Sequence, residues 1–460
     1  MPPKVNKWTV MIYMAGDNEL SNRCVDDLRE INRITKADGV EIIVQVDRSG
    51  ENDTRCYRFP QHKIDPFEEL DFVPIREINT GGKYALTRFI NYCIKEARAE
   101  RYMLVLWGHA RGMDSFTEAA PSREAAERRL RFAAGSRRGH FVRRNERGEK
   151  KRPFFIICPD QHSGQAITNF ELREILELTR RRIGRQIDIF GMDACLMGMA
   201  EVCYELRESV RYVVGSETLV PGTSWPYHTI LQHLVANPDI EPKELCNIIV
   251  KAFVAYYAPY DAQDVQLSVL DMERAEPLAA AVRRLSNLLT PLMVDGDQVD
   301  GDSPGKNAVI KSHWEAQSFD EDQYVDLFDF CNVLRQNCRL ADSGGTEEIR
   351  EAAKSVMRIL DPRSAAAALG EGAGPGGGFI TTSHWHGDAL DHSYGLSIYF
   401  PWAEVAEDRY RHLDFAKPEH ADWLSFIKSY VGATGRESRD PDTDNRNSPD
   451  SQHWDASLVE

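Results

Sequence analysis

The sequence predicts an α/β fold in which a mostly parallel central sheet is covered by helices on both faces. Over the first 290 residues, short apolar runs rich in β-branched residues alternate with amphipathic stretches. Strands buried on both faces have this composition, and their alternation with helices is typical of parallel sheets. The apolar fraction of 42% and the charged fraction of 28% belong to a globular chain that can bury such a core.

Each expected strand and helix corresponds to a definite segment of the sequence. The expected strands are Trp8–Met14, Glu41–Val46, Tyr102–Trp107, Phe154–Cys158, Ile187–Phe190 and Tyr212–Gly215. Apolar residues at helical spacing predict helices around Leu86, Ile90, Cys93 and Ile94, and around Leu172, Ile175, Leu176 and Thr179. A late apolar run, 394–401, is expected to add a strand to the main sheet or to a small C-terminal subdomain. In open sheets the active site lies at the carboxyl ends of the strands, so the residues directly after strands are the first candidates.

The length of 460 residues suggests about three domains at roughly 150 residues each. The alternating pattern instead predicts one large core over residues 1–290. A C-terminal part over 291–435 is expected to pack on this core and complete it. The last segment, 436–460, is polar and acidic, and it is expected to be a disordered tail.

The charge and the apolar runs exclude two classes of partner. The chain has 72 acidic and 56 basic residues, a formal net charge of −16, which argues against nucleic-acid binding because phosphates would be repelled. The apolar runs are far shorter than the roughly 20 residues that a membrane span needs. The first residues contain no apolar stretch of signal-peptide length before the first expected strand. We therefore expect a cytoplasmic protein.

The nine cysteines form no pair at the spacing of a zinc ribbon or a thioredoxin-type site. Most of them stand in apolar contexts, so we expect buried, reduced thiols, in keeping with a cytosolic protein. An acidic loop begins at Asp295 and Asp297, but Val299 and Lys306 replace oxygen ligands that a calcium loop needs. We therefore expect no required cofactor, and calcium binding stays open. The densest histidine cluster, His384, His386, Asp388 and His392, is interpreted as a polar surface loop in preference to a metal site.

Two expected strands end in residues that can carry acyl-transfer chemistry. The strand 102–107 is followed by Gly108 and His109, and the strand 187–190 runs on to Asp193 and Cys195. A thiolate at such an edge can attack a carbonyl, and an imidazole beside it can protonate the leaving amine and later activate water. A helix is expected to open directly after Cys195, and its N-terminus would favour the thiolate. An isolated Cys and His at strand ends are more often structural, so this pattern alone does not decide.

A set of motifs connects these two residues to a known family. They occur in the order Trp8–Asn18, Val44–Arg48, Leu106–His109, Thr168–Leu172, Asp193–Gly198, Gly215–Glu217 with Trp225–Tyr227, Tyr324–Leu327 and Gly395–Pro401. With these motifs the chain resembles the clostripain family of cysteine peptidases, in the caspase-like clan. Each motif alone is weak evidence, but the ordered set spans most of the chain.

The resemblance implies a caspase-like α/β/α sandwich and cleavage after Arg or Lys. It implies that His109 is the general acid/base and Cys195 the nucleophile. The oxyanion hole would consist of the backbone amides of Cys195 and Ala110. Asp193 matches the floor of the specificity pocket, where a buried carboxylate selects a basic side chain. Its alternative role is to form a turn or cap a helix, because Asp is favoured just before helices.

Two positions depart from the family pattern. Ala110 stands where the family usually has glycine, and a left-handed alanine would cost about 1 kcal/mol or more. Glu217 stands where the family tends to carry two consecutive acidic residues. Glu217 is a candidate to line the substrate site, and a surface position at a strand end is the alternative.

Residues 123–152, between His109 and Cys195, form a basic insertion. They contain 12 Lys or Arg and four Glu, a formal charge of +8, so the other 430 residues carry −24. Members of the clostripain family, which the chain resembles, are cut between their catalytic His and Cys. The insertion is therefore a candidate activation loop of a zymogen, cut by the enzyme itself or by an upstream protease. Candidate cleavage residues are Arg129, Arg138, Arg144, Arg147, Lys151 and Arg152.

Other interpretations remain beside these. The insertion could be a solvated loop without a role, and a nucleic-acid-binding arm is disfavoured because it holds only two aromatics, Phe132 and Phe141. The chain could be a catalytically silent caspase-like module that binds basic peptides, or a different thiol acyl-transferase or amidase. As a peptidase, its partners would be proteins with exposed Arg or Lys. Its role would be in intracellular defence or cell-death signalling.

Overall fold

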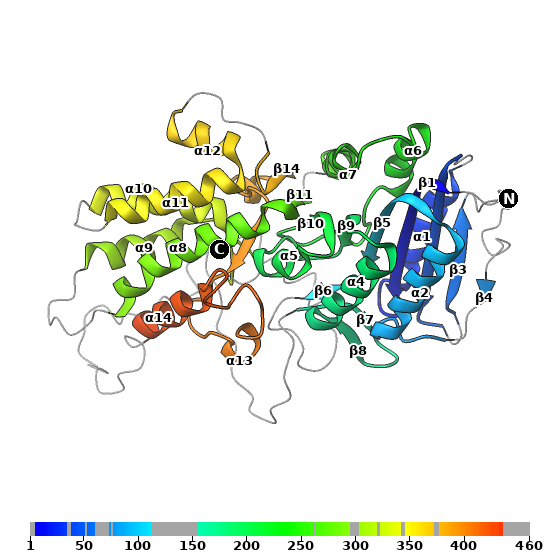
Figure 1. Cartoon of the computed structure of the whole chain (residues 1–460), viewed down its shortest axis with the longest axis horizontal. Coiled ribbons are helices and arrows are strands. Elements are labelled where there is room, and N and C mark those ends of the chain that lie inside the picture. The colour runs from blue at the N-terminus through cyan, green and yellow to red at the C-terminus, as the bar shows by residue number, and fades with distance from the viewer. Residues whose placement is uncertain are drawn as a thin grey trace, which may run out of the picture.

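The computed structural model describes residues 5–34, 38–50, 53–59, 73–74, 77–111, 155–260, 263–294, 303–319, 323–341, 346–371 and 377–435. A nine-stranded sheet forms the centre of this structure (Figure 1). In sheet order its strands are β14 (Ile380–His386), β11 (Val265–Asp271), β10 (Val210–Gly215), β9 (Ile187–Asp193), β5 (Ala99–Trp107), β1 (Asn6–Gly16), β2 (Val40–Arg48), β3 (Arg55–Phe59) and β4 (Val73–Pro74).

The five central strands, from β10 to β2, run parallel. Two further strands at each edge are antiparallel to their neighbours. The predicted parallel sheet is confirmed, and the antiparallel edges are additions to it. β3 follows β2 after a short connection, which suits an antiparallel pair, whereas parallel neighbours need a longer crossover.

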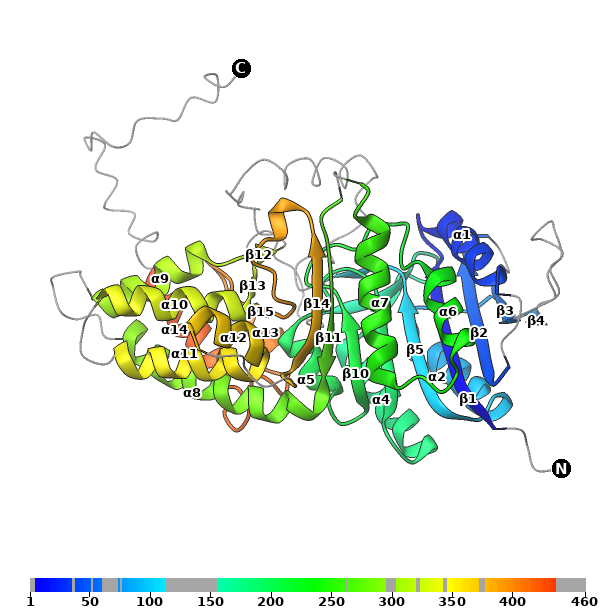
Figure 2. The ribbon, with the colours of Figure 1, turned by 90° about the horizontal axis from the view of Figure 1, so that it is seen from above.

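Helices cover both faces of the sheet, as the sequence predicts. One face carries α1 (Ser21–Asn32), α6 (Tyr227–Ala236) and α7 (Pro242–Tyr257), and the other carries α2 (Lys83–Glu96), α4 (Asn169–Ile183) and α5 (Ala200–Leu206). Figure 2 shows α6 and α7 lying together on the first face. The predicted apolar stripes of α2 and α4 are confirmed, because all eight of their named residues are buried.

The C-terminal half of the chain forms a helical layer at the β14 edge (Figure 2). Its helices are α8 (Ala275–Val294), α9 (Pro304–Glu315), α10 (Leu327–Ala341), α11 (Thr346–Leu360), α12 (Pro362–Leu369), α13 (Glu407–Tyr410) and α14 (Trp423–Gly435), with short turns η2 (Met272–Arg274) and η3 (Asp388–Leu390). A small sheet lies among them, formed by β12 (Ser318–Phe319), β13 (Tyr324–Asp326) and β15 (Ser397–Tyr399).

This small sheet contains the predicted late strand, since β15 lies within the run 394–401. β15 therefore belongs to the small sheet and not to the main one. One continuous apolar core includes residues on both sides of position 290. The division at that position and a separate C-terminal subdomain stay predictions. Within the described residues, every helix is too short or too polar to serve as a membrane span.

The predicted strand at 154–158 is placed differently from the expectation. It is β7 (Ile156–Asp160), and it pairs with β6 (Ala110–Arg111) and β8 (Gln165–Thr168) in a third, antiparallel sheet. β6 ends at Arg111, before the basic insertion 123–152, and β7 begins at Ile156, shortly after it. Ala110 pairs with Ile157, so the chain leaves and returns at neighbouring positions. The insertion itself and its candidate cleavage residues lie outside the described residues.

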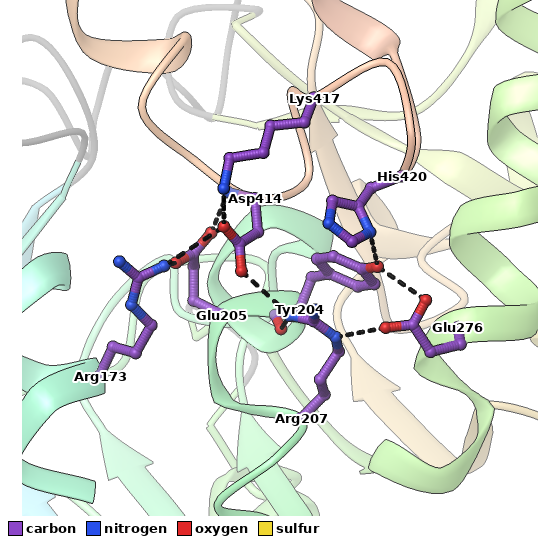
Figure 3. A network of polar contacts seen from close by, with 8 residues as sticks. All are labelled: Arg173, Tyr204, Glu205, Arg207, Glu276, Asp414, Lys417 and His420. Atoms are coloured by element: carbon purple, nitrogen blue, oxygen red, sulfur yellow. Dashed lines mark hydrogen bonds and ion pairs between the residues drawn. The ribbon is translucent and has the colours of Figure 1, made fainter. Parts of the chain in front are cut away.

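A network of polar contacts joins this core to the C-terminal half (Figure 3). Tyr204 of α5 donates a hydrogen bond to Glu276 of α8 and lies 2.7 Å from His420 Nδ1. The buried Glu205 carboxylate pairs with Arg173 of α4 at 2.6 Å and accepts a hydrogen bond from the Asp414 amide. Three elements distant in sequence are thereby fixed around α5.

Replacing Glu205 with alanine is expected to lower the free energy of unfolding by about 2–4 kcal/mol, because Arg173 and the Asp414 amide then lose their buried acceptor. Chemical denaturation measures this change. Glu177→Ala on the same helix as Arg173 is the control, since it removes a half-exposed i,i+4 pair with Arg181 worth about 0.5 kcal/mol or less. Equal losses for the two variants would contradict the importance of the network.

Candidate active site

His109 and Cys195 are carried by neighbouring strands in the middle of the sheet. Trp107 at the end of β5 is the register partner of Asp193 at the end of β9, and the Gly108 amide donates to the Asp193 carbonyl at 3.2 Å. His109 and Cys195 each stand two residues past this register pair. The structure therefore brings the two predicted catalytic residues to the same part of the carboxyl edge.

Gly108 makes this strand exit feasible. Its φ is +142°, and a Cβ at this position would lie 3.0 Å from the Ala15 carbonyl oxygen. Glycine is thus required directly before the histidine. Ala110 has no positive φ, so the strain considered for an alanine at this position does not arise. The contribution of its amide to an oxyanion hole stays a prediction.

Cys195 differs from the other eight cysteines in being partly exposed. The others are buried, and none of the nine forms a disulfide, as expected. Burial raises the pKa of thiols such as Cys24, Cys158 and Cys203 above the ordinary value. Those thiols are therefore poor nucleophiles, because only the thiolate reacts readily. Of the nine cysteines, Cys195 alone is partly exposed.

The expected helix directly after Cys195 is wrong. α5 begins only at Ala200, and its N-cap is Met199. Leu196 has a φ of +57°, and its amide donates to the Thr218 carbonyl, while the Gly198 amide donates to the Ser216 carbonyl. Pairing with the segment 216–218 takes the place of the first helical turn. The N-terminus of α5 therefore does not directly follow the thiol.

The segment after β10 also covers the thiol. The Val220 amide lies 3.3 Å from Cys195 Sγ, and the Val220 carbonyl oxygen lies 3.7 Å from it. No motif in the sequence indicates this contact, because it depends on how the loop after β10 folds back. In the described conformation, part of the approach to the nucleophile is occupied by the protein's own backbone.

Glu19 is a residue of the site that sequence reasoning missed. Its Oε1 lies 3.1 Å from His109 Nε2. Glu19 comes three residues after the end of β1, at the same carboxyl edge as His109, and this position is the signal that could have indicated it. A carboxylate at this distance can orient the imidazole. The His109 carbonyl also accepts a hydrogen bond from the Cys158 amide at 2.9 Å.

Asp193 is buried on the face of the sheet that carries α1, α6 and α7. Its Oδ2 accepts hydrogen bonds from the Trp225 amide at 3.1 Å and the Tyr227 hydroxyl at 2.9 Å. Among the described residues, Oδ1 has no hydrogen-bond partner although it is buried. Burial raises the pKa of this carboxyl to about 7. Asp193 caps no helix, but its two hydrogen bonds hold the turn at Trp225 and Tyr227, so the turn-forming alternative fits the structure. The pocket role stays a prediction.

Glu217 is fully buried and has no surface open to a substrate in this conformation. Its amide donates to Gln266, and its carboxyl faces Asp326 of β13. Burial and the nearby Asp326 raise the pKa of Glu217 well above its usual range. The surface position considered for it is wrong, and its role in substrate binding stays a prediction.

The histidine cluster lies on β14 and the turn after it, away from His109 and Cys195 in the chain and in the sheet order. Among the described residues, no three His, Cys, Asp or Glu side chains are arranged to hold a metal ion. Asp295, Asp297 and Val299 lie outside those residues. Lys306, also considered in the calcium loop, belongs to α9.

The parallel sheet covered by helices on both faces, with His109 and Cys195 at neighbouring strand exits, has the expected caspase-like α/β/α arrangement. The sequence model of the clostripain family matches residues 12–123 and 145–428 of the chain. The chain therefore belongs to the clostripain family, which confirms the resemblance seen in its motifs.

Individual relatives agree with this assignment. Clostripain of Hathewaya histolytica is 26% identical over 382 residues, 73% of this chain and 66% of that protein, so the chain spans just under two thirds of this relative. A secreted C11 cysteine protease from Bacteroides thetaiotaomicron, solved with an irreversible peptide inhibitor, has a TM-score of 0.59 and 17% identity over 91% of this chain and 99% of its own. An inactive zymogen C11 protease from Parabacteroides distasonis has a TM-score of 0.55 and 19% identity at the same coverage. These likenesses show the fold.

Proposed function

We propose that the chain is a cysteine endopeptidase that cleaves peptide bonds after arginine or lysine. The observation that carries this proposal is the partly exposed Cys195 beside the exit of the strand that bears His109, in a chain of the clostripain family. Comparing hydrolysis of an arginine-containing fluorogenic peptide by the wild type and by Cys195→Ala tests it.

In the proposed mechanism the Cys195 thiolate attacks the carbonyl carbon of the scissile bond. The oxyanion that forms is stabilised by the backbone amides of Cys195 and Ala110. The protonated His109 gives its proton to the leaving amine, and a thioester remains on the enzyme. His109 then takes a proton from water, which attacks the thioester and releases the acid product. Glu19 holds the imidazole during both proton transfers.

Specificity in this proposal comes from the buried carboxylate of Asp193. A charged guanidinium or ammonium would give its unpaired Oδ1 a charge-assisted hydrogen bond. A neutral side chain would leave the carboxyl buried and without that partner, which costs free energy. Clostripain and the C11 proteases among the relatives support a peptidase, and the finer choice between Arg and Lys is part of the proposal.

We also propose that the chain is a zymogen that is activated by cleavage in the 123–152 insertion. The family's sequence model leaves residues 124–144 unmatched, and these form the larger part of the basic segment. The contact of Val220 with the Cys195 thiol supports a form in which the nucleophile is covered. Cleavage by the enzyme itself and cleavage by an upstream protease are both compatible with the basic composition.

Cleavage in the insertion is expected to leave the two products associated. The cut separates β1, β2 and β5 from β9 and β10, yet β5 and β9 pair along the centre of the sheet and bury Leu104 and Phe190 between them. No disulfide joins the pieces. Both should therefore elute as one species in native size-exclusion chromatography and separate on a denaturing gel without reductant. Separate elution under native conditions would contradict the expectation.

The remaining expectations are proposals of the same kind. The substrates are proteins with exposed Arg or Lys, and no metal is required, with calcium as the alternative. A cytoplasmic role in defence or cell-death signalling is the proposed setting, although the similar B. thetaiotaomicron protease is described as secreted. Subcellular fractionation decides this point. A catalytically silent module that binds basic peptides is the second candidate, favoured by the covered thiol.

A further inference from the structure

A second buried carboxylate lies on the same face of the sheet as Asp193. Asp27 stands on α1 and is only 5% exposed. Its Oδ2 accepts hydrogen bonds from the Trp107 indole nitrogen and from the Ser224 hydroxyl, each at 2.7 Å. No family motif in the sequence includes Asp27, and this residue takes no part in the proposed mechanism.

Two connections place Asp27 beside Asp193. Trp107, which donates to Asp27, is the register partner of Asp193 across β5 and β9. Ser224 donates to Asp27, and the next residue along the chain, Trp225, donates to Asp193. The two carboxylates thus hold consecutive residues of one turn. Burial raises the pKa of the Asp27 carboxyl to about 8, and the charge of Asp193 adds to this shift.

The surroundings of the two carboxylates contain no compensating cation among the described residues. Neither side chain has an ion pair there. The groups around them are Cys24, Trp107, Ser224, Trp225, Tyr227, Tyr256 and Tyr257, with Glu30 adding further negative charge. Asp193 Oδ1 is buried without a hydrogen bond. In such surroundings the charged form of paired carboxyls is costly, so they favour the protonated form unless a cation joins them.

We propose that Asp27 is a second specificity-determining residue, which binds the cationic side chain of the substrate together with Asp193. This inference deepens the proposed peptidase function and rests on it. A guanidinium presents five N–H donors along two edges, so it can reach carboxylates on both sides, whereas an ammonium is a single point of charge. The pair therefore favours arginine over lysine.

The alternative is that Asp27 only holds the turn at Ser224. A neutral asparagine or glutamine oxygen could accept the same two hydrogen bonds at a smaller desolvation cost. Ser224 itself has a φ of +57°, an unfavourable backbone conformation for a residue other than glycine. A guanidinium that replaces the Ser224 hydroxyl at Asp27 would release this strained turn. A buried carboxyl and a strained partner both fit a site that exchanges one donor for another.

The test uses the full chain and two matched peptides, which carry arginine or its neutral isostere citrulline before the cleaved bond. For Asp27→Asn, kcat/KM with the arginine peptide is expected to fall at least about tenfold, mainly through KM. With the citrulline peptide it should change less than about twofold. Asp27→Glu restores the charge and is expected to restore the preference for arginine. Asp26→Asn is the control, because it removes a neighbouring charge whose side chain is 59% exposed on the same helix.

Equal losses with both peptides in Asp27→Asn would overturn the inference, since a residue that only supports the turn affects every substrate alike. Ser224→Ala gives an independent reading if Asp27→Asn does not fold. Removing the hydroxyl that occupies Asp27 is expected to lower KM for the arginine peptide, and a fall in kcat/KM with both peptides would overturn the inference. All variants are first cut in the 123–152 insertion. A cut wild type that cleaves neither peptide contradicts the proposed function itself, whereas a selective cut wild type with an equally selective Asp27→Asn contradicts only the role of Asp27.

Discussion

Replacing Cys195 with alanine is expected to lower hydrolysis of arginine peptides by at least about 10⁴-fold, because no other thiol can take over as nucleophile. The remaining cysteines are buried, and burial raises the pKa of thiols such as Cys158 and Cys203 away from the reactive range. The measurement is the steady-state rate with a fluorogenic peptide, together with a fragment map of the insertion on a denaturing gel.

The fragment map separates the two forms of the zymogen proposal. An intact Cys195→Ala chain beside a cut wild type indicates self-cleavage, whereas a wild type that stays intact until another protease is added indicates an upstream activator. Cys338→Ala on α10 is the matched control, since it removes a buried thiol far along the chain from the site and should retain activity. Equal activity of the wild type and Cys195→Ala would refute the role of this cysteine.

Asp193→Asn is expected to lower kcat/KM for the arginine peptide by about 10²-fold or more and to change the citrulline peptide little. The asparagine oxygen can still accept from the Trp225 amide and the Tyr227 hydroxyl, so the turn they belong to should keep its place. Asp188→Asn, at the other end of β9, is the control and should leave both peptides unaffected. A parallel loss for both peptides would show that Asp193 only supports the fold.

The same residue predicts a pH dependence. Because burial raises the pKa of Asp193 to about 7, the carboxyl is neutral in acid and becomes charged as pH rises through that value. The charged form attracts a cationic side chain, so the ratio of kcat/KM for arginine over citrulline peptides should increase from pH 6 to pH 8. Taking the ratio cancels the ionisation of the nucleophile and of His109. In Asp193→Asn the ratio should vary less with pH, and an unchanged pH profile would argue against the assignment.

The sequence predicts the centre of this protein better than its periphery. Local composition predicts the parallel strands. The ends of the apolar runs predict that His109 and Cys195 stand where two of these strands leave the sheet. The antiparallel strands β11 and β14 are set by distant pairing, which no local pattern encodes. The helix expected after Cys195 failed for a similar reason: the amides of Leu196 and Gly198 bond to the 216–218 segment, and that competition is tertiary.

The sequence did not indicate three residues at or near the proposed site, which are Glu19, Val220 and Asp27. Asp27 follows Asp26 on an amphipathic helix, and the sequence alone does not distinguish these two adjacent acids. In the structure Asp27 is 5% exposed, whereas the side chain of Asp26 is largely exposed. Val220 reaches Cys195 only because its loop folds back over the strand exit. Position at the carboxyl edge could have drawn attention to Glu19, whereas Asp27 and Val220 required the packed structure.

β5 precedes the insertion in the chain and β9 follows it, so a cut in the insertion places these two strands on different polypeptides. If the chain is cut in the insertion as proposed, His109 stays with one polypeptide and Cys195 with the other, so neither product would be an enzyme by itself. The proposed active site would then exist only as long as the two products remain a heterodimer, and its activity would follow the dissociation constant of that heterodimer. Conditions that weaken the central strand pairing, such as denaturant or dilution over long times, then switch off an activated molecule. Mixing products from His109 and Cys195 variants should restore activity only in the combination that unites both native residues.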